Sequence, residues 1–198
     1  MEEKKNTHAY ILAGGKSSRM GTDKAVLMLE GKTILQRIID ELRPAVEKII
    51  IVSDNPEHGK FGMERIPDKI KNSGPAGGIY TVLAHCSSEK MMVVSCDMPF
   101  IKTEAVLFML ENSKDSQITV PVFQNQLEPM FAVYSKSCLA KWAELIGSGT
   151  FKLQHLFGHF TQSKIVVDAN PLFVGPFFMN MNSSEDFNKA KTFVKHDN

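Results

Sequence analysis

Residues 11–24 read Ile11-Leu-Ala-Gly-Gly-Lys-Ser-Ser-Arg-Met-Gly-Thr-Asp-Lys24. The apolar run at 8–13 that leads into this segment predicts a buried strand. Gly14 and Gly15 end that strand, and because glycine lacks a Cβ, the backbone there can approach a ligand closely. The cations that follow within the segment are Lys16, Arg19 and Lys24. A strand end, free backbone amides and concentrated positive charge together favour a polyphosphate ligand.

Neither of two common phosphate-binding motifs matches this segment. A P-loop has a glycine, four further residues and then Gly-Lys-Ser/Thr. The required glycine is replaced by Tyr10 before Gly15-Lys16-Ser17, and by Val26 before Gly31-Lys32-Thr33. The dinucleotide fingerprint G-x-G-x-x-G is absent as well. The segment is therefore a phosphate loop of another kind or, as the alternative, an ordinary strand-to-loop turn with solvated charges.

The chain has 198 residues, of which 43% are hydrophobic and 23% are charged, as in ordinary globular proteins. We expect a single domain over residues 1–198, with a flexible N-terminal tail at 1–7. The net charge of +1 gives no bulk attraction to nucleic acid or to an anionic membrane, so we expect neither as a partner. An anionic ligand must instead be held by local charge.

The three cysteines form no Cys-x-x-Cys pair, which is typical of free thiols in a reducing compartment. The first seven residues are polar and mixed in charge, unlike a signal peptide. No apolar run approaches the roughly 20 residues that a membrane helix needs. These features predict a cytoplasmic protein.

Short apolar runs alternate with amphipathic runs along most of the chain. The predicted strands are 8–13, 46–52, 63–66, 91–95, 118–122, 130–134, 165–168 and 178–180. The predicted helices are 33–43, 78–85, 103–111, 135–146, 150–157 and 183–195. This alternation predicts an α/β fold of three layers, Rossmann-like, in which helices cover both faces of a mostly parallel central sheet.

Polar side chains follow several of the predicted strands. The glycine loop, Asp54-Asn55, Asp68 and Asp97 each come just after one. Ligands of such sheets bind outside the carboxyl ends of the strands, so we expect these residues to converge on one cleft. Asp97 is the best placed for Mg²⁺, which usually takes one or two protein carboxylates and completes its shell with water and substrate phosphates. The alternative is that Asp97 caps the next turn.

Three further sites remain ambiguous from the sequence. Asp68 follows a predicted strand and could bind a ribose hydroxyl, or it could stabilise its own turn. The segment Gly74-Pro-Ala-Gly-Gly78 opens a helix and offers backbone amides, or it forms a turn only. The segment Asn180-Met-Asn182 places two amides where they could reach a metal or a phosphate, and helix capping by Asn182 or Ser183 is the alternative.

The run Leu-Ala-Gly-Gly, followed by Ser-Arg-Met-Gly and Asp-Lys, resembles the signature loop of nucleotidyltransferases that activate sugars, polyols and pterins. With Gly74-Pro-Ala-Gly-Gly78, Asp97-Met-Pro and Asn180-Met-Asn-Ser183, the order and spacing resemble the molybdenum cofactor guanylyltransferase family, from about His8 to Phe193. The short length agrees, because related enzymes for sugars and isoprenoid precursors usually carry extra domains or insertions. The resemblance implies a nucleotidyltransferase fold of the Rossmann-like type.

The resemblance also implies a reaction, in which GMP passes from GTP to the pterin phosphate of molybdenum cofactor with release of pyrophosphate. The nucleotide-binding residues implied are Leu12, Ala13, Gly14, Gly15, Lys24, Asn55, Asp68, Gly77 and Asp97. Asp97 and Asn182 are implied as ligands of Mg²⁺ or Mn²⁺. Arg19, Lys24 and Asp97 are implied in catalysis, where cations neutralise charge on the transferring and leaving groups. The partners implied are GTP, molybdopterin, pterin-delivering proteins and molybdoenzymes.

One departure from the family concerns Lys152, which stands where many members have an arginine, and a lysine does not reproduce the planar guanidinium fork. Two other functions remain open from the sequence. One is a cytidylyltransferase or sugar-phosphate nucleotidyltransferase of the same fold. The other is a non-catalytic GTP-binding regulator, against which the intact Lys24 and Asp97 argue.

Overall fold

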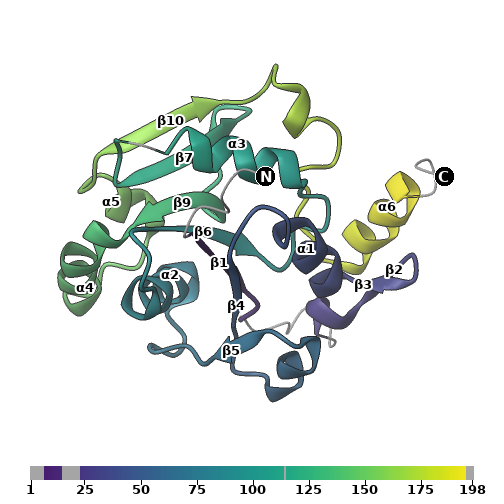
Figure 1. Ribbon diagram of the computed structural model, residues 1–198, viewed down its shortest axis with the longest axis horizontal. Coiled ribbons are helices and arrows are strands. Elements are labelled where there is room, and N and C mark those ends of the chain that lie inside the picture. The colour runs from purple at the N-terminus through teal and green to yellow at the C-terminus, as the bar shows by residue number, and fades with distance from the viewer. Residues whose placement is uncertain (1–6, 15–22, 114, 195–198) are drawn as a thin grey trace.

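The computed structural model describes residues 7–14, 23–113 and 115–194. An eight-stranded sheet lies at the centre of the described fold (Figure 1). Its strands are β1 (His8–Leu12), β4 (Lys48–Val52), β5 (Glu64–Ile66), β6 (Lys90–Ser95), β7 (Ile118–Phe123), β8 (Gln126–Leu127), β9 (Phe131–Ser135) and β10 (Gln162–Val166). Their spatial order is β10-β7-β9-β6-β1-β4-β5, and β8 pairs with β7. The predicted tail at 1–7 lies outside the described residues except for Thr7, which is buried and accepts a hydrogen bond from the Glu47 amide.

The sheet is mostly parallel, as predicted. Strand β1 pairs in parallel with β4 and β6, β4 with β5, and β7 with β10. Strand β9 is antiparallel to both of its neighbours, β6 and β7, and β8 is antiparallel to β7. The centre of the sheet thus joins two parallel blocks through a single antiparallel strand.

Helices cover both faces of the sheet, which confirms the three-layer prediction (Figure 1). The helices are α1 (Ile34–Leu42), α2 (Gly74–His85), α3 (Thr103–Glu111), α4 (Leu139–Gly147), α5 (Leu153–Phe157) and α6 (Ser184–Val194). Short 3-10 turns are η1 (Lys24–Val26), η2 (Pro56–Phe61), η3 (Lys136–Cys138) and η4 (Pro171–Phe173), and β2 (Met28–Leu29) pairs with β3 (Lys32–Thr33). Helices α1, α3 and α6 pack into one hydrophobic core, and α2, α4 and α5 pack into the other.

Strand β1 shows why its sequence is apolar from Ala9 to Leu12. Ala9 and Ile11 belong to the core on one face, whereas Tyr10 and Leu12 belong to the core on the other. A strand that is covered on both faces needs apolar side chains throughout rather than at alternate positions. The strand ends at Leu12, so Ala13 and Gly14 lie at the carboxyl edge of the sheet.

The start of α2 corrects the prediction, which placed it at Gly78 rather than at Gly74. Glycines are weak helix formers, but neighbouring side chains leave little room for a Cβ at two of these positions. A Cβ on Gly77 would lie 1.6 Å from Ser73 Oγ, and a Cβ on Gly78 would lie 3.0 Å from Leu12 Cδ1. Pro75 is compatible with the first turn, where its missing N–H has no helical partner. The helix therefore starts at the edge of the sheet and packs closely against β1.

The strand predicted at 178–180 is wrong. The chain turns at 175–178, where the Met179 amide donates to the Pro176 carbonyl over 2.8 Å. Phe177 and Phe178 pack there with Phe131 and Phe173, with ring centroids 4.8 to 6.3 Å apart. Aromatic residues favour strands in general, but here their packing with one another fixes a turn instead.

Candidate functional site

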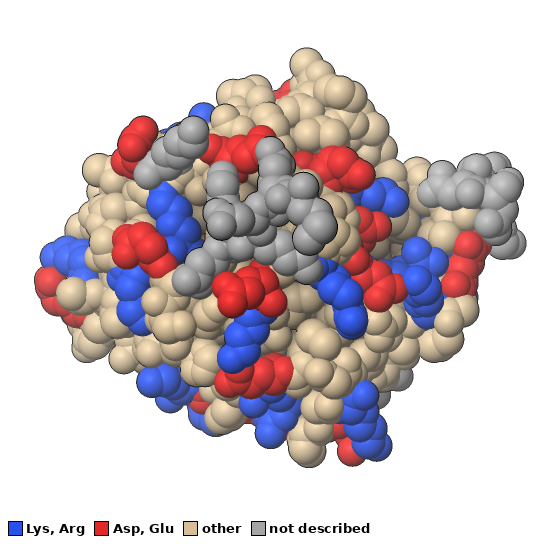
Figure 2. All heavy atoms as spheres, in the orientation of Figure 1, with Lys and Arg blue, Asp and Glu red and all other residues tan. Residues whose placement is uncertain are grey.

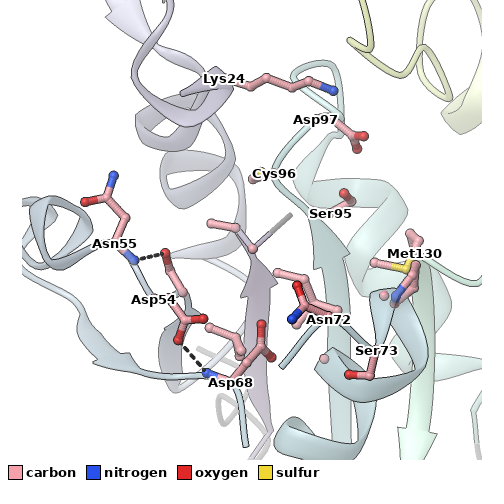
Figure 3. A pocket seen from close by; sticks show the side chains of 18 of the residues that line it. Lys24, Asp54, Asn55, Asp68, Asn72, Ser73, Ser95, Cys96, Asp97 and Met130 are labelled. Atoms are coloured by element: carbon pink, nitrogen blue, oxygen red, sulfur yellow. Dashed lines mark hydrogen bonds between the residues drawn. The ribbon is translucent and has the colours of Figure 1, made fainter. Parts of the chain in front are cut away.

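A cleft of about 1220 Å³ lies beyond the carboxyl ends of β1, β4 and β6 (Figure 3). The sequence-predicted residues that line it are Leu12, Ala13, Gly14, Lys24, Asn55, Asp68, Asp97 and Asn182. Gly77 lies buried inside α2, and its neighbour Gly78 lines the cleft instead. Gly15 and Arg19 lie outside the described residues. The structure thus brings together most of the positions that the sequence placed at strand ends.

The surface of the protein carries basic and acidic side chains in a mixed distribution. On the face shown in Figure 2, basic and acidic side chains are interspersed over the described surface. This mixture agrees with the net charge of +1. Recognition of an anion therefore depends on single side chains and amides inside the cleft.

Lys24 reaches across the cleft to a segment that is distant in the sequence. Its Nζ donates a hydrogen bond of 2.9 Å to Asn182 Oδ1. The amide of Met181 donates to the Asp97 carbonyl over 3.0 Å, which ties the same segment to the end of β6. In Figure 3, the Lys24 and Asp97 side chains point into the same end of the cleft, with Asp68 at the opposite end.

The start of α6 holds Asn182 in place by a reciprocal cap. Ser183 Oγ accepts from the Asp186 amide, and Asp186 Oδ2 accepts from the amides of Ser183 and Asn182. The hydrogen bonds to Ser183 and Asn182 lower the pKa of the Asp186 carboxyl. Capping is thus carried out by the Ser183 side chain, and the Asn182 side chain remains directed at Lys24.

Asp97 carries a buried carboxylate oxygen, Oδ1, that has no hydrogen-bond partner among the described residues. A buried and unpartnered carboxylate oxygen is costly unless a ligand satisfies it. Carboxylate and amide oxygens such as those of Asp97 and Asn182 are the hard ligands that Mg²⁺ prefers. No group of three or more His, Cys, Asp or Glu residues that could enclose a metal ion occurs within the described ranges. The donor set therefore fits an ion that takes most of its ligands from water and substrate phosphates.

Asp68 lies against the glycine loop. A Cβ on Gly14 would approach Asp68 Oδ2 to 2.8 Å, so only glycine fits there without a shift. The Thr81 hydroxyl lies 3.4 Å from Asp68 Oδ1, and the Asp68 amide donates to Asp54 Oδ1 over 3.3 Å. Burial raises the pKa of the Asp68 carboxyl, and the nearby charge of Asp54 raises it further. The Asp68 carboxylate is thus held at the cleft wall and faces the start of the loop.

Asn55 lines the cleft, but both ends of its side-chain amide have protein partners. Its Oδ1 accepts from the Glu57 amide over 3.0 Å and caps η2. Its Nδ2 donates to Asp23 Oδ2 over 2.7 Å. The position predicted from the strand end is therefore correct, and the side chain serves the local structure.

Three residues in or near the cleft were not predicted from the sequence: Asp23, His58 and Glu128. Asp23 caps η1 and contacts the fully buried His58 through a 2.8 Å bond. An Asp directly before a short helix is a recognisable capping signal, whereas a single histidine in a polar turn carries none. Glu128 lines the cleft, and its side chain makes no hydrogen bond or ion pair with another described residue. Burial raises the pKa of the Glu128 carboxyl to about 7.

Cys96 stands between Ser95 and Asp97 in the cleft wall. Burial raises the pKa of its thiol to about 12, and the charges of Asp97 and Asp23 act in the same direction. The thiolate is the nucleophilic form of cysteine, so the raised pKa argues against a nucleophilic role for this thiol. Cys86, Cys96 and Cys138 are all free thiols.

Comparisons with known proteins find similarity over most of the chain. A family model described as MobA-like NTP transferase domain matches residues 9–163. A protein of Clostridium perfringens (strain 13 / Type A) named "Probable molybdenum cofactor guanylyltransferase" is 44% identical over 132 residues, which are 66% of each chain. A protein of the same name from Pelotomaculum thermopropionicum is 32% identical over 190 residues, 94% of this chain and 92% of that one.

A solved structure supports the fold. It is the crystal structure of molybdopterin-guanine dinucleotide biosynthesis protein A from Archaeoglobus fulgidus, with a TM-score of 0.81. The likeness covers 96% of this chain and 99% of that chain, at 24% sequence identity. The two chains thus share their architecture over nearly their whole length.

Proposed function

The chain belongs to the MobA-like NTP transferase family, and we propose that it transfers GMP from GTP to the pterin phosphate of molybdenum cofactor with release of pyrophosphate. It is a nucleotidyltransferase. The observation that carries the proposal is the cleft, where Asp97 Oδ1, which has no partner among the described residues, lies at the same end as Lys24. The similarity over 94% of the chain to a relative named for this reaction supports the choice of substrates.

The proposed nucleotide site comprises Leu12, Ala13, Gly14, Gly15, Lys24, Asn55, Asp68, Gly77 and Asp97. Support comes from the cleft, which the described members line except for Gly77. The start of α2 also lies at this edge, where Ser73 and Gly74 line the cleft, and Ser73 forms no side-chain cap there. Unpaired amides at a helix start are suited to phosphate or to polar groups of a nucleotide.

Nucleotidyltransferases of this family typically use a divalent metal ion. We propose Mg²⁺ or Mn²⁺ for this chain, held by Asp97 and Asn182. When bound, such an ion supplies Lewis-acid stabilisation of charge on the phosphates. The carboxylate oxygen of Asp97 and the amide oxygen of Asn182 are the donors that this ion accepts.

The transfer needs no covalent enzyme intermediate. The terminal phosphate of the pterin attacks the α-phosphorus of GTP, a new P–O bond forms, and the bond to the β-phosphate oxygen breaks so that pyrophosphate leaves. Lys24 and Arg19 neutralise charge on the transferring and leaving groups, so the contribution of the protein is positioning and electrostatic stabilisation. A phosphate nucleophile is already ionised near neutral pH, and a general base is not required.

We further propose that the enzyme acts in the cytoplasm together with proteins that deliver the pterin and with molybdoenzymes that receive the product. The free thiols of all three cysteines support a reducing compartment. Within the described ranges, no helix has the length and apolar character that crossing a membrane requires.

The direct test is turnover by the purified protein with molybdenum cofactor, Mg²⁺ and each nucleoside triphosphate in turn, with the dinucleotide product quantified. Formation of the guanine dinucleotide from GTP is the expected result. Equal use of CTP would move the function to a cytidylyltransferase. Failure with every nucleotide would contradict this acceptor and this reaction.

A further inference from the structure

His58 is a fully buried histidine in a turn that is otherwise largely exposed. Its side chain is 0% exposed, whereas Pro56, Glu57, Gly59 and Lys60 of η2 are exposed. Polar side chains are seldom buried in a surface turn unless they have a specific partner. The partner of this imidazole is on a different segment of the chain, at the end of the glycine loop.

The partner is the Asp23 carboxylate, and His58 Nε2 lies 2.8 Å from its Oδ2. The same oxygen accepts the 2.7 Å bond from Asn55 Nδ2, and Asp23 Oδ1 accepts from the Ala25 amide over 3.0 Å. Both carboxylate oxygens are therefore satisfied by the protein. His58 Nδ1 has no partner among the described residues, so its contact with Asp23 is the one hydrogen bond that places the ring.

Asp23 is directly followed by Lys24, the first residue of η1. The cap on Ala25 fixes the entry of the chain into that turn, and the direction of the Lys24 side chain follows from it. Lys24 Nζ then crosses to Asn182 Oδ1, at the end of the cleft where Asp97 lies. A buried ring on η2 is thus connected, through the Asp23 carboxylate, to the residue next to it, Lys24, which lines the cleft.

We propose that His58 is a positioning residue for nucleotidyl transfer, which acts by holding Asp23 and thereby aiming Lys24. This role rests on the proposed function, since it assigns Lys24 to the nucleotide. The ring itself touches no substrate, because it is buried behind Asp23. A positioned cation stabilises the developing charge only while its geometry is kept, so a small displacement is sufficient to reduce the rate.

The test compares two variants of His58 with one matched control. His58→Phe keeps a buried ring and removes the donor, whereas His58→Gln keeps an N–H donor. We expect the dissociation constant of GTP, measured by calorimetry with Mg²⁺, to rise about tenfold in His58→Phe and at most about twofold in His58→Gln. His155→Phe alters an exposed histidine outside the cleft and should leave GTP binding unchanged.

A double-mutant cycle separates aiming from general destabilisation. In a Lys24→Ala background, His58→Phe should change the GTP dissociation constant by less than about twofold, because the group that it aims is gone. Equal losses in both backgrounds, or equal effects of His58→Phe and His58→Gln, would overturn the role of His58. The same cycle in kcat/KM should give the same pattern.

Asp23→Asn provides a second route if His58→Phe does not fold. Asparagine is also a good helix cap. Its side-chain NH₂ group, however, is a donor, and where it replaces Asp23 Oδ2 it cannot accept the hydrogen bond from His58 Nε2. We expect a loss of GTP affinity similar to that in His58→Phe and not additive with His58→Gln. Unchanged affinity in Asp23→Asn would also overturn the inference. Absence of dinucleotide product in the wild type would overturn the proposed function alone. The double-mutant cycle in GTP binding would still test whether His58 acts through Lys24.

Discussion

At the residue scale, two positions in the cleft wall have a clear physical constraint. Gly14 is such a position because a Cβ there would lie 2.8 Å from Asp68 Oδ2. Glu128 is another, because its carboxyl lies half-buried in the cleft wall without a protein partner among the described residues. The two residues allow separate tests, one of space and one of charge.

Gly14→Ala should weaken GTP binding by displacing Asp68. The added methyl and the carboxylate cannot both keep their places, so either the loop or Asp68 must move. We expect a rise of about tenfold in the GTP dissociation constant by calorimetry, and a lower melting temperature. Gly147→Ala is the matched control, because a Cβ at Gly147 meets nothing within 4 Å. Equal GTP binding by Gly14→Ala and the wild type would show that the loop has room for a side chain.

Glu128→Gln should stabilise the protein selectively at higher pH. Because burial raises the pKa of Glu128 to about 7 in the folded protein, its protonated form contributes stability that is fully present below the usual value of 4.5. That contribution is lost as the pH rises from there through about 7. Glutamine cannot ionise, so the melting temperature of Glu128→Gln relative to the wild type should increase between pH 4.5 and 7 and stay level above. A constant difference from pH 4.5 to pH 8 would contradict this expectation.

At the scale of elements, the periodicity of apolar residues predicted most of the helices and strands. It failed where contacts between elements determine the local structure. The helix predicted at 33–43 is present as α1, whose residues Ile34, Leu35, Ile38, Ile39 and Leu42 are fully buried. Thr33 Oγ1 caps this helix by accepting a 3.1 Å hydrogen bond from the Gln36 amide. The start of α2 could not be predicted, because its glycines are explained by Ser73 and Leu12 and not by their own propensity. The contact of Asp23 with His58 joins residues 35 positions apart, and no local pattern encodes it.

Gly77→Ala should destabilise the start of α2. The added Cβ would lie 1.6 Å from Ser73 Oγ and 2.6 Å from Ser73 Cβ. The Ser73 side chain must therefore move away, and it loses its 2.6 Å hydrogen bond to the Ile70 carbonyl. We expect a loss of about 1–3 kcal/mol in the free energy of unfolding by denaturant titration. Ser73→Gly in the same chain removes both clashing atoms, and the double variant should be more stable than the sum of the two single losses predicts. Strict additivity would argue against this contact.

At the scale of the whole molecule, the sheet gathers the site from segments that are far apart in the chain. Strands β1, β4 and β6 run in parallel, so their carboxyl ends open at one edge and the polar residues after them meet there. The proposed identity of the nucleotide rests on the name of a relative that is similar over 94% of the chain, because no single described side chain specifies the base.

We expect GTP to be preferred over ATP and CTP by at least roughly a hundredfold in kcat/KM. Guanine offers a ring N–H and an exocyclic amine as donors with O6 as an acceptor, whereas adenine carries a donor amine at position 6. A mismatch in a closed site leaves polar groups unpaired and costs on the order of 1–3 kcal/mol for each. Steady-state kinetics with the three nucleotides and one pterin acceptor will measure the ratio, and comparable values for ATP would contradict selection by the base.

The hydrogen bond between Lys24 and Asn182 joins residues that are 158 positions apart. A ribosome delivers the N-terminal part of a domain first, so the glycine loop and the first strands emerge long before the segment that meets Lys24. Closing so long a loop costs chain entropy that only the finished sheet can offset. A nascent chain therefore carries Lys24 early but gains the partner of Lys24, and with it the part of the cleft wall at Asn182, only late in synthesis.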